Sequence, residues 1–280
     1  MQQISSELVG LTTDAIAVAW TEKDAILYAL GVGCKPDGEL DYVYEGRGPR
    51  VLPTYAVIPA FKALLAVIGR IDVNLAMLLH GDQALELHRP LPAEATAQVI
   101  GEVTAVWDKG KAAVIEVESR LNDAQGPLAT ARSSLFIRGG GGFGGKRGPS
   151  ASNANEPPAR APDHVVTDRV QIEQGAIYRL SGDLNPIHID PDFAKVAGFD
   201  APFLHGLCTY GMVGRALLGT VCGGDPGRLV SLTARFADRV LYGDELITQI
   251  WVTGAGTAVV RAQTGRGNTV LSQAQARWTP

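Results

Sequence analysis

Six residues in the second half of the chain bring together a carboxylate, an amide and an imidazole: Asp183-Leu184-Asn185-Pro186-Ile187-His188. A carboxylate and an imidazole that share one water molecule form a general acid–base arrangement. Pro186 disfavours helical angles at Asn185, so we expect a tight non-helical turn that aims Asp183, Asn185 and His188 at one point. Asp, Asn and Pro are also ordinary turn residues, and the spacing alone leaves a purely structural turn equally open.

Two short helices are expected to hold this turn. The first ends near Ser181, where Gly182 can act as the C-cap, and its predicted apolar face consists of Ile172, Ala176, Ile177 and Leu180. The second begins after Asp190, which is a typical N-cap, with Pro191 at the first helical position. Asp183 and His188 are therefore predicted to lie at the two ends of a connection between helices.

A longer, glycine-containing helix is predicted to begin at Gly206, within "FLHGL". Backbone N–H groups in a first helical turn lack intrahelical partners and lie at the positive end of the helix dipole. An N–H there with no side chain beside it is well placed to stabilise an oxyanion. We expect His205 to shape the loop without taking part in catalysis. We expect a sheet to approach the helix backbone at Gly211 and Gly214, and core packing for the stripe Leu207, Tyr210, Gly211, Gly214, Leu217, Leu218 and Val221.

The composition of the 280-residue chain suits two lobes of about 130 residues each. Apolar residues make up 46% and charged residues 19%, and the net charge of −4 with mixed signs argues against a nucleic-acid partner. The apolar runs are shorter than the roughly 20 residues that a membrane span needs. The three cysteines lack metal-type spacing and the N-terminus lacks an export pattern, so we expect a cytoplasmic protein.

Residues 139–163 are rich in glycine and proline and are predicted to be a flexible surface linker. Gly139, Gly141 and Gly144 fit the G-x-G-x-x-G pattern of dinucleotide-binding proteins. That pattern requires a helix to open directly after the glycines, whereas "KRGP" follows here. We therefore interpret the segment as a tether between two domains, residues 1–138 and 164–280.

The two halves repeat one pattern, a helix followed by several strands with turn residues between them. Gly110 of the first half corresponds to Gly256, 146 positions later. We infer an internal duplication. A curled antiparallel sheet that wraps one long apolar helix is the simplest way for each copy to bury its apolar surface.

The stretch "YRLSGDLNPIHIDPDFAKVAGFDAPFLHGL" at 178–207 resembles the signature of the (R)-specific 2-enoyl-CoA hydratases, the hydratase 2 or MaoC-like family. The first half resembles the tail-binding half of the family members with two such domains. The matching segments are "LYALGVG" at 27–33, "ELDYVYEGRG" at 39–48, "LPTYAVIP" at 52–59 and "LHGDQALELHRPLP" at 79–92. The resemblance implies an α+β protein with two hotdog folds in one chain, each a curled antiparallel sheet around a central helix.

Carried over to this sequence, the resemblance makes Asp183 the catalytic acid/base and His188 its partner. Asn185 matches the asparagine that helps to hold the water, and the backbone N–H of Gly206 matches the oxyanion-hole donor. The first half lacks an acid-x4-His counterpart, as in family members whose first half accommodates a long acyl chain. The implied reaction is the reversible syn hydration of trans-2-enoyl-CoA to (R)-3-hydroxyacyl-CoA in fatty-acyl or related lipid metabolism, sterol side chains included. The resemblance implies an acyl-CoA substrate, a homodimer, and neither a metal nor an organic cofactor.

Three other functions stay open on sequence grounds. A dehydratase that acts on (R)-3-hydroxyacyl groups of acyl carrier protein would run the same chemistry backwards. A hotdog thioesterase would usually place a carboxylate on the long helix, and residues 209–218 contain none. A non-catalytic acyl-CoA-binding protein would be expected to lack the acid–base pair. The sequence does not define the acyl chain, the carrier, or the basic residues that would bind CoA phosphates.

Overall fold

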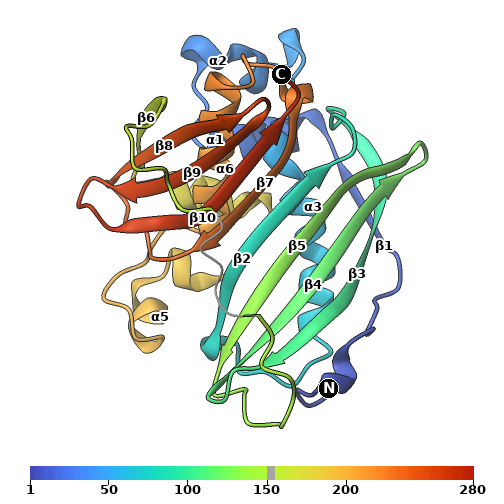
Figure 1. The fold of residues 1–280 in the computed structure, drawn as a ribbon. Coiled ribbons are helices and arrows are strands. Elements are labelled where there is room, and N and C mark those ends of the chain that lie inside the picture. The colour runs from blue at the N-terminus through green and yellow to red at the C-terminus, as the bar shows by residue number, and fades with distance from the viewer. Residues whose placement is uncertain (150–154) are drawn as a thin grey trace.

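The computed structural model describes residues 1–149 and 155–280, and its ten strands form one antiparallel sheet with helices packed behind it (Figure 1). The strand order is β1-β3-β4-β5-β2-β7-β10-β9-β8-β6. The strands are β1 (Ile16–Trp20), β2 (Leu78–Leu87), β3 (Ala95–Asp108), β4 (Ala112–Asp123), β5 (Gly126–Arg138), β6 (His164–Arg169), β7 (Leu229–Phe236), β8 (Glu245–Gly254), β9 (Thr257–Thr264) and β10 (Thr269–Trp278).

Helices precede the strand meander in both halves. The α-helices are α1 (Glu22–Gly31), α2 (Pro36–Val43) and α3 (Val57–Ile68) in the first half, and α4 (Gln174–Tyr178), α5 (Pro191–Val196) and α6 (Gly206–Thr220) in the second. Short 3-10 helices are η1 (Ser6–Leu8), η2 (Glu45–Arg47), η3 (Pro53–Ala56), η4 (Leu75–Met77), η5 (Arg179–Ser181), η6 (Pro186–His188) and η7 (Pro226–Arg228).

The strand order of the second half repeats that of the first. Strands β1-β3-β4-β5-β2 on one side correspond to β6-β8-β9-β10-β7 on the other, and the two copies join where β2 pairs with β7. Gly110, in the turn between β3 and β4, and Gly256, between β8 and β9, both have positive φ angles, +83° and +69°. These equivalent turns need a residue without a Cβ penalty, and they agree with the predicted duplication.

Each long helix packs on the sheet of its own half. In the first half, α3 lies against β3 and β4, and a Cβ at Gly101 would come within 3.0 Å of the Ala63 carbonyl. In the second, the Tyr210 hydroxyl of α6 donates to the Leu232 carbonyl of β7 at 2.6 Å. Alternating buried and exposed residues along the strands place the apolar core between sheet and helices.

The expectation that a sheet approaches Gly211 and Gly214 is wrong, because α6 faces the sheet with Tyr210 and turns its glycines toward the first half. A Cβ at Gly211 would lie 2.5 Å from Val32 and 2.7 Å from the Tyr28 hydroxyl, and one at Gly214 would lie 2.4 Å from Thr54. Helical segments α1 and η3 therefore make the close approach. The glycines let the first half pack directly on the backbone of the second.

Polar contacts also fix the two halves to each other. Arg215 of α6 bonds to Glu39 of α2 at 2.6 Å and to Asp168 of β6 at 2.8 Å, and its side chain is largely buried. The guanidinium fork can serve both carboxylates at once because it offers several donors in fixed directions. The α6 helix is thereby held by both halves.

The start of the segment between the halves bonds to the turn between β3 and β4. The Asp108 carboxylate accepts N–H groups from Gly110, Gly142 and Gly144 at 2.8–2.9 Å, and these bonds lower its pKa. Within residues 139–149, no helix follows the glycines, which fits the rejection of a nucleotide loop. Residues 150–154 of the predicted flexible linker lie outside the described residues. Where the description resumes, Asn155 bonds to Gln273 of β10 at 3.1–3.2 Å.

Among the helices of residues 1–149 and 155–280, none is both long enough and apolar enough to cross a membrane.

Candidate active site

Two short helices flank the connection that contains Asp183, as predicted. The η5 turn that continues α4 ends at Gly182, whose φ of +138° suits glycine and whose N–H donates to the Arg179 carbonyl at 3.0 Å. The Asp190 carboxylate accepts N–H groups of Asp192 and Phe193 at 2.9 and 3.2 Å and so caps α5. Local capping chemistry therefore sets both ends of the connection, as its sequence indicates.

The predicted apolar face of the first helix is partly wrong, because Ile172 and Leu180 are 72% and 60% exposed. The face that packs carries Gln174, Gly175 and Tyr178 instead. The Gln174 amide donates to the Gly31 carbonyl, and a Cβ at Gly31 would lie 3.1 Å from Tyr178. Helix α4 thus packs on helix α1 of the first half through this hydrogen bond and through the close contact of Tyr178 with Gly31. Neither contact can be predicted from the spacing of apolar residues.

Asp183 and His188 converge. A carboxylate oxygen of Asp183, a ring nitrogen of His188 and a ring nitrogen of His205 all lie within 4.8 Å of one another. The Nδ1 atom of His188 lies 2.9 Å from the Phe203 carbonyl oxygen, which can only accept, so Nδ1 carries the proton and Nε2 has a free lone pair. Burial lowers the pKa of His188, although the nearby charge of Asp183 opposes the shift. The imidazole is therefore neutral near pH 7 and able to take up a proton.

His205 is the third member of the cluster, and the sequence interpretation underrated it. It is fully buried, and Nε2 donates to the backbone carbonyl of Asp183 at 3.1 Å. Its ring stacks on His188 at a centroid distance of 3.9 Å and an angle of 31°. Burial, with a smaller contribution from His188, lowers its pKa to about 3. The neutral His205 ring therefore holds the Asp183 backbone by a hydrogen bond and the His188 ring by a ring contact. In the sequence, this role of His205 is indicated only by its position directly before Gly206.

Tyr242, in the loop between β7 and β8, fixes the other side of the turn. Its hydroxyl donates to the His188 carbonyl at 2.5 Å. A Cβ at Gly175 would lie 1.9 Å from the same hydroxyl, so only glycine leaves room for the tyrosine. The two contacting residues are 54 positions apart in the sequence. The contact between Tyr242 and His188 therefore could not be predicted from the sequence.

Gly206 begins α6, as predicted, and its N–H points to no acceptor among the described residues. A Cβ at this position would meet the ring of Phe236 at 3.1 Å. The site therefore offers an unpaired donor at the positive end of a helix, next to an aromatic wall. This is the arrangement expected of an oxyanion donor.

Asn185 has a different surrounding from the one expected. Its side-chain oxygen accepts the N–H of Ile187 at 3.1 Å and caps η6, and its own N–H donates to the Asp183 carboxylate at 3.2 Å. The residue is exposed. The oxygen takes part in the cap, and the amide nitrogen, which has no partner among the described residues, is free to contact a water or a substrate.

Asp183, His188 and His205 also form a group whose residue types can hold a metal ion. One nitrogen of each ring bonds to a backbone carbonyl, Nδ1 of His188 to Phe203 at 2.9 Å and Nε2 of His205 to Asp183 at 3.1 Å, so the lone pair of each ring lies on its other nitrogen.

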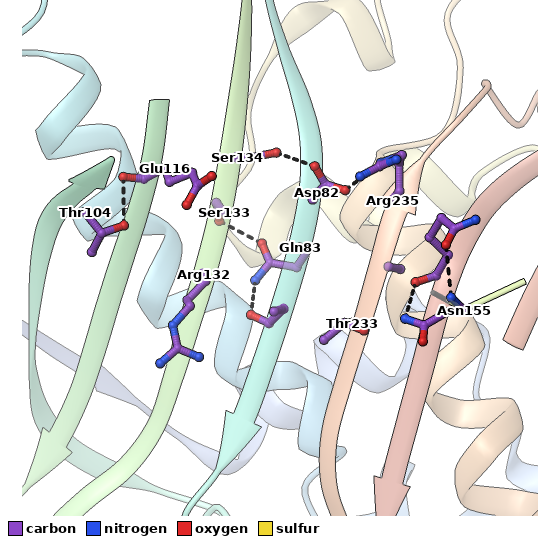
Figure 2. Close-up of a pocket in the computed structure, with 13 residues that line it drawn as sticks. Asp82, Gln83, Thr104, Glu116, Arg132, Ser133, Ser134, Asn155, Thr233 and Arg235 are labelled. Atoms are coloured by element: carbon purple, nitrogen blue, oxygen red, sulfur yellow. Dashed lines mark hydrogen bonds and ion pairs between the residues drawn. The ribbon is translucent and has the colours of Figure 1, made fainter. Parts of the chain in front are cut away.

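The groove shown in Figure 2 is not this site. It has a volume of about 320 Å³, extends over β5, β2 and β7, and contains none of the predicted site residues. Its polar groups satisfy each other, because Ser133 donates to Gln83 at 2.8 Å, and Ser134 and Arg235 donate to Asp82 at 2.7 and 2.8 Å. Convergence of titratable groups, and not groove size, identifies the candidate active site.

Known protein families match both halves of the chain. Residues 19–139 match the MFE-2 hydratase 2 N-terminal domain, and residues 153–274 match the MaoC like domain. The chain is 44% identical to the 3-hydroxyacyl-thioester dehydratase Y of Mycobacterium tuberculosis, over 93% of this chain and 91% of the relative. It is 40% identical to the probable enoyl-CoA hydratase 2 of Dictyostelium discoideum, over 90% of this chain and 88% of the relative.

A solved structure has the same architecture. The MaoC-like dehydratase from Phytophthora capsici superposes with a TM-score of 0.89 at 31% identity, and the match covers 99% of this chain and 98% of that one. The chain therefore belongs to the MaoC-like family of hydratase 2 type. The predicted α+β class with two hotdog folds in one chain is confirmed.

Proposed function

We propose that the protein hydrates trans-2-enoyl-CoA reversibly, by syn addition, to (R)-3-hydroxyacyl-CoA. The observation that carries the proposal is the convergence of the Asp183 carboxylate and a ring nitrogen of His188 near the start of α6, where the Gly206 N–H has no acceptor in the described part of the chain. Two similar proteins are named for the two directions of such a reaction, one a hydratase and one a dehydratase.

In this mechanism Asp183 and His188 orient one water and remove its proton as the oxygen adds to Cβ. The negative charge that develops on the thioester oxygen is stabilised by the Gly206 N–H and the positive end of α6. The same pair returns the proton to Cα, and because one water serves both carbons, the addition is syn. The amide nitrogen of Asn185 helps to hold the water.

The first half is proposed to accommodate the acyl chain. This half borders the helix that begins at Gly206, because Tyr28, Val32 and Thr54 pack on α6. No acid-x4-His pair precedes α3. We assign residues 1–138 to this domain, 139–163 to the linker and 164–280 to the catalytic domain.

The experiment is an assay of the purified chain with crotonyl-CoA, with the loss of enone absorbance as signal and the configuration of the product determined with (R)- and (S)-specific dehydrogenases. We expect turnover and an (R) product. An (S) product, or tight binding of crotonyl-CoA without turnover, would contradict the proposal, and the latter result would identify an acyl-CoA-binding protein. Preference for crotonyl-acyl carrier protein over crotonyl-CoA would favour the acyl-carrier-protein dehydratase.

We further propose a homodimer in the cytoplasm. The segment that carries the site exposes the apolar side chains of Leu184, Phe193 and Val196, 58%, 43% and 89% exposed, which a second copy could cover. The three cysteines are free, as expected of a reducing compartment. Light scattering of the purified chain at micromolar concentration measures the mass directly, and a monomer would contradict the dimer.

A further inference from the structure

Tyr242 lies in a loop whose backbone is fixed on both sides of this residue. Before it, the Val240 carbonyl accepts the Leu204 N–H at 2.8 Å. After it, the Gly243 N–H donates to the carbonyl of Val170, the residue that follows β6, at 2.9 Å. The Tyr242 side chain therefore extends from a backbone that is bonded to two other segments of the second half.

The hydroxyl of Tyr242 lies beside two backbone carbonyls that belong to different segments. It is 2.5 Å from the His188 carbonyl oxygen and 3.4 Å from the Phe203 carbonyl oxygen, and both oxygens can only accept. Burial raises the pKa of Tyr242 to about 12, so the hydroxyl keeps its proton near pH 7 and is the donor. One side chain thus connects η6, which ends at His188, with the segment directly before α6.

The same two segments form the hydrogen bond that sets the tautomer of His188. Nδ1 of His188 donates to the Phe203 carbonyl at 2.9 Å, and the Phe203 ring meets the imidazole edge-on with centroids 5.1 Å apart. The proton stays on Nδ1 because this nitrogen has an acceptor. If the two segments separate, the proton can move to Nε2, which then loses the lone pair that takes up a proton from water.

The loop between β7 and β8 also contacts the ring of Phe203. The guanidinium carbon of Arg239 lies 4.9 Å from the centre of the Phe199 ring and 5.8 Å from the centre of the Phe203 ring. A cation over an aromatic face is attracted by the ring quadrupole. The loop therefore holds Phe203 by its ring and its carbonyl, and holds the next residue, Leu204, by a backbone bond.

We propose that Tyr242 is a positioning residue for the hydration reaction, because its hydroxyl holds the His188 and Phe203 carbonyls together and so keeps the proton of His188 on Nδ1 and the lone pair on Nε2. Tyr242 acts on the reaction only through His188. The kinetic part of the inference rests on the proposed function, whereas the tautomer of His188 is a property of the protein alone.

The test measures kcat and KM for crotonyl-CoA together with the tautomer of His188. The tautomer is read by 15N NMR of histidine-labelled protein, with the His188 signals assigned by comparison with His188→Gln. Tyr242→Phe should lower kcat about tenfold, the value of one hydrogen bond, change KM less than about twofold, and convert the Nδ1–H form of His188 into a mixture of both forms. Tyr44→Phe, which removes the hydroxyl of an exposed tyrosine in the first half, should change neither property.

Gly175→Ala tests the same contact from the opposite partner. Its Cβ would lie 1.9 Å from the Tyr242 hydroxyl and should displace it, with the same two changes as Tyr242→Phe. In the Tyr242→Phe background the hydroxyl is already absent, so Gly175→Ala should lower kcat less than it does in the unchanged protein.

An unchanged kcat in Tyr242→Phe would overturn the proposal, and so would a lower kcat with an unchanged tautomer, which would indicate a packing role only. Failure of the proposed function is a separate result, in which the unchanged protein does not hydrate crotonyl-CoA. The NMR comparison still decides whether Tyr242 sets the tautomer in that case. Circular dichroism and thermal unfolding monitor each variant, and Gly175→Ala replaces Tyr242→Phe in both measurements if the latter does not fold.

Discussion

The two halves share one topology, but the segment before the long helix ends differently in each half. In the second half, α6 starts abruptly at Gly206, and the N–H of this residue has no partner among the described residues. In the first half, η3 runs directly into α3, and the Val57 N–H is bonded to the carbonyls of Thr54 and Tyr55. The 3-10 turn before α3 thus provides acceptors for the N–H that α6 leaves without one.

The loops that lead to these helices also use their polar residues differently. The second half holds Asp183 and His188 in a connection supported by His205 and Tyr242. The first half uses its carboxylate Glu39 to bind Arg215 of α6. The comparison teaches that a duplicated fold can keep the same sheet in both copies while chemistry and packing are divided between them.

The largest effect is expected from the acid–base pair itself. Asp183→Asn and His188→Gln should each lower kcat by 10²- to 10⁴-fold, since each removes a proton-transfer group. The fold should persist, because among residues 1–149 and 155–280 the Asp183 carboxylate accepts a hydrogen bond only from the Asn185 N–H. Crotonyl-CoA kinetics and thermal unfolding measure the two properties. Asp192→Asn, an exposed carboxylate in the first turn of α5, is the control; wild-type rates in either pair variant would refute the assignment.

Gly206 can be tested by removing only its N–H. Proline is well tolerated at the first position of a helix, and His205 has the extended backbone (φ −57°, ψ 136°) that a residue before proline prefers. Gly206→Pro should lower kcat by about 10²- to 10³-fold relative to Gly206→Ala. The alanine variant adds the same contact with Phe236 but keeps the donor. Equal rates in the two variants would show that the N–H does not act on substrate.

Stability should fall in acid because the site region buries neutral histidines. The unfolded chain binds protons at these residues near pH 6.5, whereas folded His80 and His205 do so only near pH 4 and pH 3. Their contribution is complete above pH 6.5 and is lost as the pH falls through this window. From pH 7 to pH 5 we expect a loss of about 2 kcal/mol for each. Urea unfolding measures the slope, which His205→Phe should flatten; an unchanged slope would contradict the burial of a neutral ring.

The smallest effect on the rate is expected at His205, which acts through its neighbours. His205→Phe keeps a ring beside His188 but loses the bond to the Asp183 carbonyl, and should lower kcat about tenfold with little change in KM. His205→Gln, which restores a donor, should recover part of the rate. Tyr178→Phe is a matched control, since it removes a buried hydroxyl without a partner from the ring beside His205. An equal loss in all three variants would indicate a packing role only.

Local sequence chemistry predicted much of this architecture. Capping residues and proline defined the turn at 183–190, and Gly110 and Gly256 marked the equivalent turns of the two halves. Contacts between distant segments could not be predicted in this way. The approach of Tyr28 to Gly211, of Tyr242 to His188 and of Arg215 to Glu39 depends on how the two halves pack. The sequence therefore indicated which residues could react but not which residues hold them.

The central claim is that one water, held by Asp183 and His188 in the second half alone, serves both carbons of the double bond. Hydration of crotonyl-CoA in D2O, followed by NMR of the 3-hydroxybutyryl product, tests it most directly. The account predicts a single diastereomer with deuterium and hydroxyl added to the same face. The anti diastereomer, or a mixture formed at the catalysed rate, would contradict it.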